Sequence, residues 1–517
     1  MKVALTIGDF LRRGALVHPD RTAVVDEPGT PGSLGAITYR QLDARARGMA
    51  VALDRMGVEQ GARVAIVSPN AARFQIAYFG VSGWGRVLVP VNYRLNAAEI
   101  SYIVEHSGTS VLLVDPDSAA ALAGVDAKVK IVLDGTGDDA ELFAEAPPGA
   151  EPQAWVADED ATASINYTSG TTARPKGVQL THRNCWLNAA AFGWHTEVTD
   201  RDVFLHTLPM FHCNGWGMPY AVTGMGVPQV IQRRVDGEQI LSRVAEHGVT
   251  LMCGAPAVVA AVLDAGAARR ERGEEVPGRD RVRIVVAGAP PPSKAIERVE
   301  DELGWEFIQI YGLTETAPLL TINRAPAEWD DLATPERAKR LARAGVPAIG
   351  VEVRTAADGE VLARSNHVFA GYWEQPDESA KALDGGWFHT GDEGSIDDDS
   401  YLHIADRKKD VIISGGENVS SIEVEDRLFQ HPAVAEAAVI GVPDEKWGET
   451  VKALVVLRPG SSATEAELIS HCRDALAHFK CPTSVEVRDE LPRTATGKLQ
   501  KFKLRAPYWE GRDRRVN

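Results

Sequence analysis

The sequence has little positive charge, few cysteines and no long apolar run. Its 517 residues carry 55 lysines and arginines against 72 aspartates and glutamates, which gives a formal net charge of −17. This acidic balance argues against a general nucleic-acid-binding protein, because nucleic-acid phosphates require a basic surface. No apolar run approaches the ~20 residues that a membrane helix needs, and the apolar run at the start is too short for a signal peptide. We therefore expect a protein that is neither exported nor integral to a membrane.

Only five cysteines are present, and no two of them form a C-x-x-C pair. This argues against a disulfide scaffold and favours a reduced, cytoplasmic setting. Hydrophobic residues at 44% and charged residues at 25% are ordinary for a globular protein. A chain of this length is several times a typical domain, so it must hold more than one domain or one large composite fold.

Apolar runs alternate with stretches of helical periodicity over about the first 350 residues. Near-continuous apolar strands separated by helices indicate a parallel sheet that is covered on both faces. Ligands of such sheets tend to bind beyond the carboxyl ends of the strands. The expected strands are 63–69, 87–92, 110–115, 130–134, 163–168, 203–209, 249–256, 283–290 and 307–312, and the expected helices include 181–192, 237–247 and 293–303.

The pattern changes after Pro347. Short alternating runs with turns predict a small β subdomain over about 345–405. A dense charged run at 406–410 then separates two regions with different patterns of apolar residues. We interpret it as a hinge between an N-terminal domain, 1–405, and a C-terminal domain, 406–517. The C-terminal part is typical of a compact α+β unit. Its expected elements are strands at 437–442 and 452–457 and a helix at 464–479.

The most informative segment is the loop that follows the expected strand at 163–168. It reads Tyr167-Thr168-Ser169-Gly170-Thr171-Thr172-Ala173-Arg174-Pro175-Lys176-Gly177. Glycines let backbone N–H groups approach an anion closely, while hydroxyls and a lysine supply further donors and positive charge. This is the composition of a loop that cradles phosphate. It is not a Walker A loop, since no G-x-x-x-x-G-K-[ST] occurs in the chain.

This loop resembles the T-S-G-T-T-G-x-P-K-G signature of the adenylate-forming superfamily, which includes acyl-CoA synthetases, peptide-synthetase adenylation domains and luciferases. Ala173 stands where that family usually has glycine, and the resemblance covers essentially the whole chain. It implies a large N-terminal domain of parallel α/β sheets with a small β subdomain, and a mobile α+β C-terminal domain. The loop residues implied to bind ATP are Thr168, Ser169, Gly170, Thr171, Thr172 and Lys176.

Further motifs match the nucleotide site of that superfamily. The segment 311–315 matches Y-G-x-T-E at a strand end, which implies that Thr314 bonds the α-phosphate and that Glu315 ligates Mg²⁺. Mg²⁺ is usually held by one or two carboxylates together with phosphate oxygens. Asp392 lies in a T-G-D motif and is implied to accept both ribose hydroxyls, because an ionised carboxylate only accepts. The resemblance also assigns to the ATP site Gly288, Ala289, Pro290, Gln309, Ile310, Tyr311, Gly312 and Arg407.

Two C-terminal motifs complete the resemblance. The segment 492–498 resembles P-x-T-x-[ST]-G-K, which makes Lys498 the expected catalytic lysine. A lysine suits this role because a mobile point charge can bridge the attacking carboxylate and the α-phosphate. Lys409 is the implied hinge residue, about which the small domain rotates between two half-reactions. A G-G-E-N-like loop is implied to line the tunnel of the CoA thiol, with Ser414, Gly415, Gly416 and Glu417.

The acid to be activated is less well defined by the residues. The segment 208–212 matches L-P-x-F-H, which implies that His212 lies between the acid pocket and the thiol tunnel and helps to orient the carboxylate. Peptide-synthetase domains usually have an aspartate at this place, so an α-amino acid is disfavoured. Gly312 stands where acetate-activating relatives have tryptophan, which leaves room for a larger acid. The expected acid pocket consists of Phe211, His212, Trp216 and Gly312.

We interpret the chain as an ATP-dependent acid:CoA ligase. It would convert a medium-chain, long-chain or aryl carboxylic acid to an acyl-adenylate and pass the acyl group to coenzyme A, with ATP and Mg²⁺ as cofactors. One alternative keeps the adenylation and changes the acceptor to the pantetheine of a carrier protein. Another activates a different oxyacid, such as nitrite in arylamine diazotisation. Besides these small molecules we expect no nucleic-acid partner, and a homodimer is one expected assembly.

Overall fold

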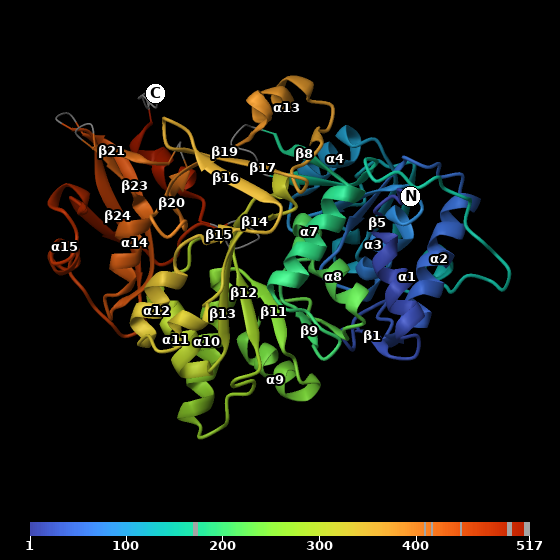
Figure 1. Cartoon of the computed structure of the whole chain (residues 1–517), viewed down its shortest axis with the longest axis horizontal. Helices are drawn as coiled ribbons and strands as arrows, with labels where there is room; N and C mark the ends of the chain where they lie inside the picture. Colours follow the sequence, from blue (N-terminus) through green and yellow to red (C-terminus); the bar gives the residue numbers. More distant parts are fainter. Residues whose placement is uncertain (169–173, 408–409, 415–416, 445–446, 494–498, 511–517) are drawn as a thin grey trace.

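The computed structural model describes residues 1–168, 174–407, 410–414, 417–444, 447–493 and 499–510. Figure 1 shows an N-terminal part with two sheets, a small group of long strands beside it, and a C-terminal domain in orange and red. We call the described residues from Asp410 onward the C-terminal domain. Among the described residues, no helix is both long and apolar enough to cross a membrane.

The larger sheet is parallel through its centre and antiparallel at its edges. Its central strands β13, β12, β11, β9 and β10 pair in parallel, whereas β14 returns antiparallel to β13 and β2 antiparallel to β1. The strands in spatial order are β15 (Val346–Pro347), β14 (Leu319–Asn323), β13 (Glu306–Gly312), β12 (Arg283–Val286), β11 (Leu251–Gly254), β9 (Phe204–His206), β10 (Gln229–Ile231), β1 (Thr22–Val25) and β2 (Ala36–Thr38).

The second sheet has the same mixed character. Its parallel strands are nearly all buried, and β7 turns back into antiparallel β8 through the glycine-rich loop. The short strand β18, which comes from much later in the chain, joins the free edge of β8. The spatial order is β18 (Gly371–Tyr372), β8 (Lys176–Thr181), β7 (Thr162–Thr168), β4 (Val87–Val91), β3 (Arg63–Val67), β5 (Thr109–Val114) and β6 (Val129–Val132).

Helices of the N-terminal part join the two sheets through a common core. Buried residues of α7, such as Ala189 and Phe192, belong to one cluster with Ile66 of the second sheet and Ile308 of the larger sheet. Several helices begin with a capping box, which satisfies N–H groups that have no partner within the helix. The helices are α1 (Gly8–Val17), α2 (Tyr39–Arg55), α3 (Ala72–Ser82), α4 (Ala97–His106), α5 (Pro116–Ala119), α6 (Gly137–Leu142), α7 (His182–His195), α8 (Met218–Met225), α9 (Gly237–His247), α10 (Pro256–Glu271), α11 (Ser293–Arg298), α12 (Thr334–Leu341) and α13 (Pro376–Ala382).

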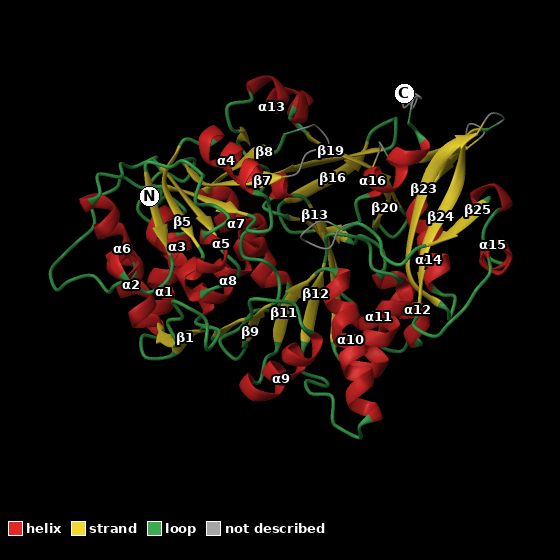
Figure 2. Ribbon diagram, turned by 180° about the vertical axis from the view of Figure 1, so that it is seen from behind, coloured by secondary structure: helices red, strands yellow, loops and turns green. Residues whose placement is uncertain are grey.

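The remaining strands form an antiparallel group and then the C-terminal α+β domain. In Figure 2 the long strands β23 and β24 lie side by side, with β25 next to them and α15 beyond. The antiparallel group is β16 (Val351–Thr355), β17 (Glu360–Ser365), β19 (Phe388–Ile396) and β20 (Leu402–Arg407). The C-terminal domain holds β21 (Ile412–Ser414), β22 (Glu417–Val419), α14 (Ser421–Phe429), β23 (Val434–Asp444), β24 (Gly448–Leu457), α15 (Glu465–Arg473), β25 (Ser484–Val487) and α16 (Lys501–Arg505).

The expected class of fold is confirmed, with an α/β N-terminal domain, a small β subdomain and an α+β C-terminal domain. The sheets are parallel at their centres and mixed overall, because short turns such as the one after β13 allow only antiparallel return. The strand expected at 203–209 ends at His206, and Pro209 could not have donated a hydrogen bond to a neighbouring strand. The helix expected at 464–479 ends at Arg473.

Candidate active site

A cleft of about 660 Å³ lies where the carboxyl ends of β12 and β13 face the C-terminal domain. Its N-terminal wall is made of the loop after β12, the end of β13 and residues of β19 and β20. The opposite wall comes from α14 and from residues on either side of the segment 494–498. The lining residues include Gly288, Ala289, Pro290, Gln309, Ile310, Tyr311, Gly312, Asp392, Asp426, Arg493 and Leu499.

The N-terminal wall of the cleft brings together residues that lie about 100 positions apart in the sequence. The Tyr311 hydroxyl donates a hydrogen bond of 2.6 Å to Asp392 Oδ2, and only 4% of Asp392 is exposed. Gly288 follows β12 with a φ of 94°, a value that favours glycine, and its loop lies along the same wall. The backbone pairs Asp392 of β19 with Arg407 of β20, so the two expected ribose contacts occupy neighbouring strands.

Gln309 adds a polar atom that the described residues leave without a partner. Its side chain is 4% exposed and lines the cleft, and its Oε1 has no hydrogen-bond donor among the described residues. A buried acceptor of this kind costs free energy unless a ligand or water donates to it. The exocyclic amine of adenine is such a donor. The wall therefore fits a nucleotide whose base lies at Gln309 and whose ribose lies at Asp392.

The expected metal ligand Glu315 lies beyond the end of β13 and is held by a segment that sequence reasoning did not identify. The Tyr372 hydroxyl donates to Glu315 Oε1 at 3.0 Å, and the Phe369 N–H donates to the Glu315 carbonyl oxygen at 2.8 Å. The neighbouring Thr314 is 9% exposed, and its carbonyl oxygen accepts a weak contact from Cys213 Sγ at 3.9 Å. Residues 369–372 thus fix the position of the Y-G-x-T-E motif.

Lys176 of the phosphate loop is paired with a carboxylate. Its Nζ lies 2.5 Å from Glu378 Oε2 of α13 and 4.9 Å from the centre of the Tyr372 ring. The lysine bond lowers the pKa of Glu378, which keeps this carboxyl ionised. Thr168 is the last residue of β7 and pairs with Lys176 across β7 and β8. The expected phosphate ligands Ser169, Gly170, Thr171 and Thr172 lie outside the described residues.

The C-terminal domain reaches the cleft on both sides of the expected catalytic lysine. Arg493 and Leu499 form a single antiparallel bridge with each other, and both line the cleft. Lys498 itself lies outside the described residues, as do Lys409, Gly415 and Gly416. Ser414 and Glu417 pair with each other in β21 and β22 and are not part of the cleft lining.

A direct polar contact joins the two domains next to the nucleotide wall. Asp426 of α14 accepts the backbone N–H of Ser293 at 2.9 Å and its hydroxyl at 3.1 Å. Ser293 is the first residue of α11 and follows the loop of Gly288 to Pro290 by three positions. The carboxylate therefore caps α11 from the other domain. Sequence reasoning did not find Asp426, because its partner is 133 residues away and neither residue lies in a recognisable motif.

Two residues expected in the acid pocket have other surroundings. Trp216 is 3% exposed and belongs to the main core, and its carbonyl oxygen accepts from Asn188 Nδ2 at 3.1 Å. A Cβ at Gly312 would lie 1.6 Å from the Pro318 carbonyl oxygen. A larger side chain at 312 would therefore meet the backbone of Pro318 unless the backbone moved. Phe211 is 6% exposed and packs edge to face against Tyr93 at 5.8 Å.

His212 begins a turn of unusual backbone. It is half-buried, and the next residues, Cys213, Asn214, Gly215 and Trp216, all have φ between 46° and 62°. Non-glycine residues in this region are strained, so the surrounding packing must hold the turn in place. Asn188 does so in part, because its Nδ2 donates to the Trp216 carbonyl oxygen and its Oδ1 accepts from the Leu319 N–H. The turn carries His212 at its start.

The fold and the cleft define an enzyme that binds a nucleotide between a large α/β domain and a small C-terminal domain. Residues 11–373 match the family model described as AMP-binding enzyme, and residues 423–498 match AMP-binding enzyme C-terminal domain. The chain belongs to this AMP-binding, adenylate-forming family and to its acid–CoA ligase type.

Individual relatives agree over nearly the full length. The chain is 38% identical to a 2-methylpropanoate–CoA ligase of Humulus lupulus, over 97% of this chain and 94% of the relative. It is 36% identical to 4-hydroxybutyrate–CoA ligase 2 of Metallosphaera sedula, over 96% and 93%. An o-succinylbenzoate coenzyme A synthetase of Bacillus subtilis, solved with ATP and magnesium ion, matches with a TM-score of 0.80 at 28% identity, over 96% and 99%. The chain is an AMP-forming acid–CoA ligase.

Proposed function

We propose that this ligase activates a short aliphatic acid, branched or hydroxylated, rather than the medium-chain, long-chain or aryl acid that the sequence suggested. The named relatives with 36% to 38% identity act on 2-methylpropanoate and 4-hydroxybutyrate. The packing of Phe211 and Trp216 supports a small pocket, since both side chains are buried against other residues of the protein. An aryl acid is the second candidate, because the synthetase from Bacillus subtilis acts on o-succinylbenzoate.

The observation that carries the adenylation step is the nucleotide wall, where Gln309 Oε1 has no donor among the described residues. In the proposed arrangement, Asp392 accepts the ribose hydroxyls and Tyr311 holds that carboxylate in place at 2.6 Å. Lys176 leaves Glu378 and meets the β- and γ-phosphates together with the loop 168–172. Thr314, His212 and Lys498 orient the acid carboxylate against the α-phosphorus. The carboxylate oxygen bonds to phosphorus, the bond to the bridging oxygen breaks, and pyrophosphate departs.

The donor set at Glu315 fits Mg²⁺. One carboxylate lies there next to the phosphate loop, and the described residues contain no cluster of three or more His, Cys, Asp or Glu that could hold a metal. Mg²⁺ is commonly bound by one or two carboxylates together with the phosphates of its substrate, so it needs no such cluster. Glu315 would hold the ion. When bound, Mg²⁺ neutralises charge on the triphosphate during its displacement.

The second half-reaction is proposed to use another face of the C-terminal domain. The chain crosses from β20 to β21 by a short segment around Lys409, and this is the proposed hinge. Rotation there would withdraw Lys498 and bring in the loop between Ser414 and Glu417. Neither of these two residues lines the cleft in the present arrangement. The CoA thiolate would then attack the acyl carbonyl, and AMP would leave. Exchange of one face in this way is a domain-closure step.

The test is a release assay with a panel of acids. Pyrophosphate release is measured for acids from C2 to C12, their branched and 4-hydroxy forms, and benzoates, with and without CoA. The proposal expects the highest kcat/KM for C3 to C5 acids and a thioester product that requires CoA. A maximum at C8 or longer, or with benzoates, would overturn the short-acid assignment. Turnover only with a carrier protein, or with nitrite, would replace CoA or the carboxylic acid by the alternative.

A further inference from the structure

Glu315 is held on two sides by one short segment of the chain. The Phe369 N–H binds the Glu315 backbone at 2.8 Å, and the Tyr372 hydroxyl binds its carboxylate at 3.0 Å. The two aromatic rings of this segment pack against each other with centroids 4.8 Å apart. Both the backbone and the side chain of Glu315 therefore depend on residues more than 50 positions away.

The same tyrosine also contacts the lysine of the phosphate loop. Tyr372 pairs with Val178 across β18 and β8, which places its ring beside Lys176 at the start of β8. The Lys176 ammonium lies 4.9 Å from the ring centre, within the range of a cation–π contact. The Tyr372 N–H binds Ser379 Oγ at 2.8 Å, which fixes the backbone of the residue.

We propose that Tyr372 is a positioning residue that aligns the Glu315 carboxylate and the Lys176 ammonium for Mg·ATP. The inference rests on the proposed function, which gives Glu315 to Mg²⁺ and Lys176 to the phosphates. The hydroxyl bond to Oε1 orients the carboxylate so that its other oxygen is presented to the metal. The ring face supports the ammonium when it exchanges Glu378 for phosphate. One side chain thereby couples the metal ligand to the phosphate ligand.

The chain offers a closely matched control outside the cleft. The Tyr508 hydroxyl donates to Glu486 Oε2 at 2.6 Å, and the Lys452 ammonium lies 5.1 Å from the centre of the Tyr508 ring. This triad has the same three residue types and the same two contacts of the tyrosine, although here the lysine also pairs with the glutamate at 3.5 Å. It belongs to the C-terminal domain and is absent from the cleft lining. Tyr508→Phe removes the same kind of bond without touching the proposed site.

The experiment compares Tyr372→Phe with wild type and Tyr508→Phe. Calorimetry measures the Kd of ATP with Mg²⁺ and of ATP with EDTA. For Tyr372→Phe we expect Mg·ATP affinity to fall about tenfold, since a hydrogen bond to a charged group is lost, while metal-free ATP binds within twofold of wild type. The Mg²⁺ concentration for half-maximal pyrophosphate release should rise by a similar factor, with the KM of the acid unchanged. Tyr508→Phe should alter none of these values.

A second variant tests the contact with lysine. Tyr372→Leu also removes the ring, so it should weaken metal-free ATP as well, by about threefold beyond Tyr372→Phe. Equal Kd values for the two variants would overturn the lysine part of the proposal. Unchanged Mg·ATP binding in Tyr372→Phe, or an equal loss with and without metal, would overturn the whole of it.

Glu315→Gln separates this inference from the proposed function. Glutamine keeps the shape of the side chain but removes the charge that a hard cation prefers. We expect it to lower Mg·ATP affinity at least as much as Tyr372→Phe does. If Glu315→Gln binds Mg·ATP like wild type, the assignment of Glu315 to the metal is wrong, and the positioning role falls with it. If Glu315→Gln is weakened and Tyr372→Phe is not, only the role of Tyr372 is wrong.

Discussion

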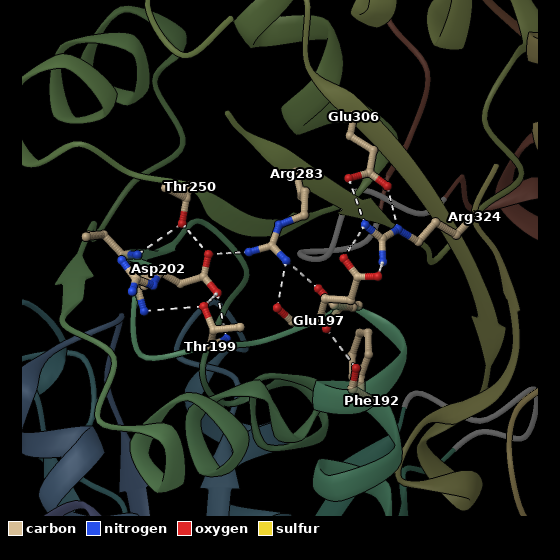
Figure 3. A network of polar contacts seen from close by, with 11 residues as sticks. Phe192, Glu197, Thr199, Asp202, Thr250, Arg283, Glu306 and Arg324 are labelled. Atoms are coloured by element: carbon tan, nitrogen blue, oxygen red, sulfur yellow. Dashed lines mark hydrogen bonds and ion pairs between the residues drawn. The ribbon is translucent and has the colours of Figure 1, made fainter. Parts of the chain in front are cut away.

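Strands β9, β11, β12 and β13 have a charge network at their amino ends, and the carboxyl ends of β12 and β13 form the nucleotide wall. Figure 3 shows the network, in which Arg283 of β12 is paired with Asp202, just before β9. Thr250, just before β11, donates to Asp202 at 2.6 Å. At the carboxyl ends of the strands of this sheet, the loop of Gly288 and Tyr311 line the cleft.

The amino ends and the carboxyl ends of these strands satisfy their polar groups in different ways. At the amino ends, the Asp202 carboxylate is bonded by Arg283, Thr250 and the Thr199 N–H, so protein groups neutralise protein groups. At the carboxyl ends, Gln309 lines the cleft, and its Oε1 has no partner among the described residues. The polar groups at the amino ends stabilise the fold, whereas the carboxyl ends leave a buried polar atom that a ligand can bind. The difference teaches that one sheet can separate stability from binding along the length of its strands.

The largest effect is expected from a substitution at the amino ends of the strands, and it concerns stability. Asp202→Ala leaves the Arg283 guanidinium, whose side chain is 13% exposed, without its carboxylate. Removal of one partner of a buried pair costs about 3–5 kcal/mol. We expect the free energy of unfolding in urea to fall by about that amount, while KM for ATP stays within twofold. A rise in the KM for ATP well beyond twofold would show that the amino ends and the carboxyl ends of the strands are coupled.

The next largest effect concerns the rate of adenylate formation in the cleft at the carboxyl ends of the strands. Lys498→Ala should slow adenylate formation by about 10²–10³, because a preorganised charge is lost from the transition state. Thioester formation from a supplied acyl-adenylate should be largely spared, and urea unfolding should match wild type. Isotope exchange between pyrophosphate and ATP measures the first step, and acyl-CoA formation measures the second. Equal loss in both half-reactions would contradict the use of two faces of the C-terminal domain.

A smaller effect is expected from pH at the carboxyl end of β9. His206 is 2% exposed, and burial lowers its pKa from the ordinary 6.5 to about 4. The unfolded chain therefore binds a proton that the folded chain refuses between about pH 6.5 and pH 4, and stability falls as the solution becomes more acidic. The contribution of this residue is about 1.4 kcal/mol per pH unit in that window. His206→Gln should flatten the pH dependence of the free energy of unfolding by this slope, whereas an unchanged slope would assign the loss to other buried histidines such as His182.

The smallest expected effect concerns the ion pair of Lys176. Glu378 is partly exposed and pairs with the Lys176 ammonium, so in the proposed arrangement it competes with phosphate for that lysine. Glu378→Gln should lower the KM for ATP about two- to fivefold, because an exposed pair contributes little and its loss frees the lysine. The neighbouring Lys381, which also binds Glu378 at 3.2 Å, offers a control, since Lys381→Gln should leave that KM unchanged. A higher KM in Glu378→Gln would mean that the carboxylate orients the lysine rather than competing with it.

Much of the fold could be predicted because its signals are local. The expected helix at 237–247 coincides with α9, since its apolar residues recur at helical spacing and Asp236 caps its start. The strand expected at 307–312 differs from β13 by one residue. The edges of the sheets could not be predicted, because pairing of β14 with β13 or of β18 with β8 depends on turns and on segments far away in the sequence.

The nucleotide motifs show the same division within the site. Tyr311 and Asp392 were both expected, and each lies in a short motif whose residue types carry the chemistry. Their mutual hydrogen bond was not expected, since it joins β13 to β19 across 81 positions. Gly312 was expected too, but its close approach to the Pro318 carbonyl oxygen, which excludes a Cβ in this backbone arrangement, was not.

The sequence by itself determined the family, the order of the elements and the residue types that can bind phosphate, ribose and Mg²⁺. These features follow from periodicity and from motifs a few residues long. Only the tertiary structure decided that Tyr372 contacts both Glu315 and Lys176, that Asp426 caps α11 from the other domain, and that Trp216 lies in the core. The physical reason is that each of these contacts joins residues separated by tens to hundreds of positions. Their distances are set by how sheets and domains pack, and no local pattern in the chain encodes them.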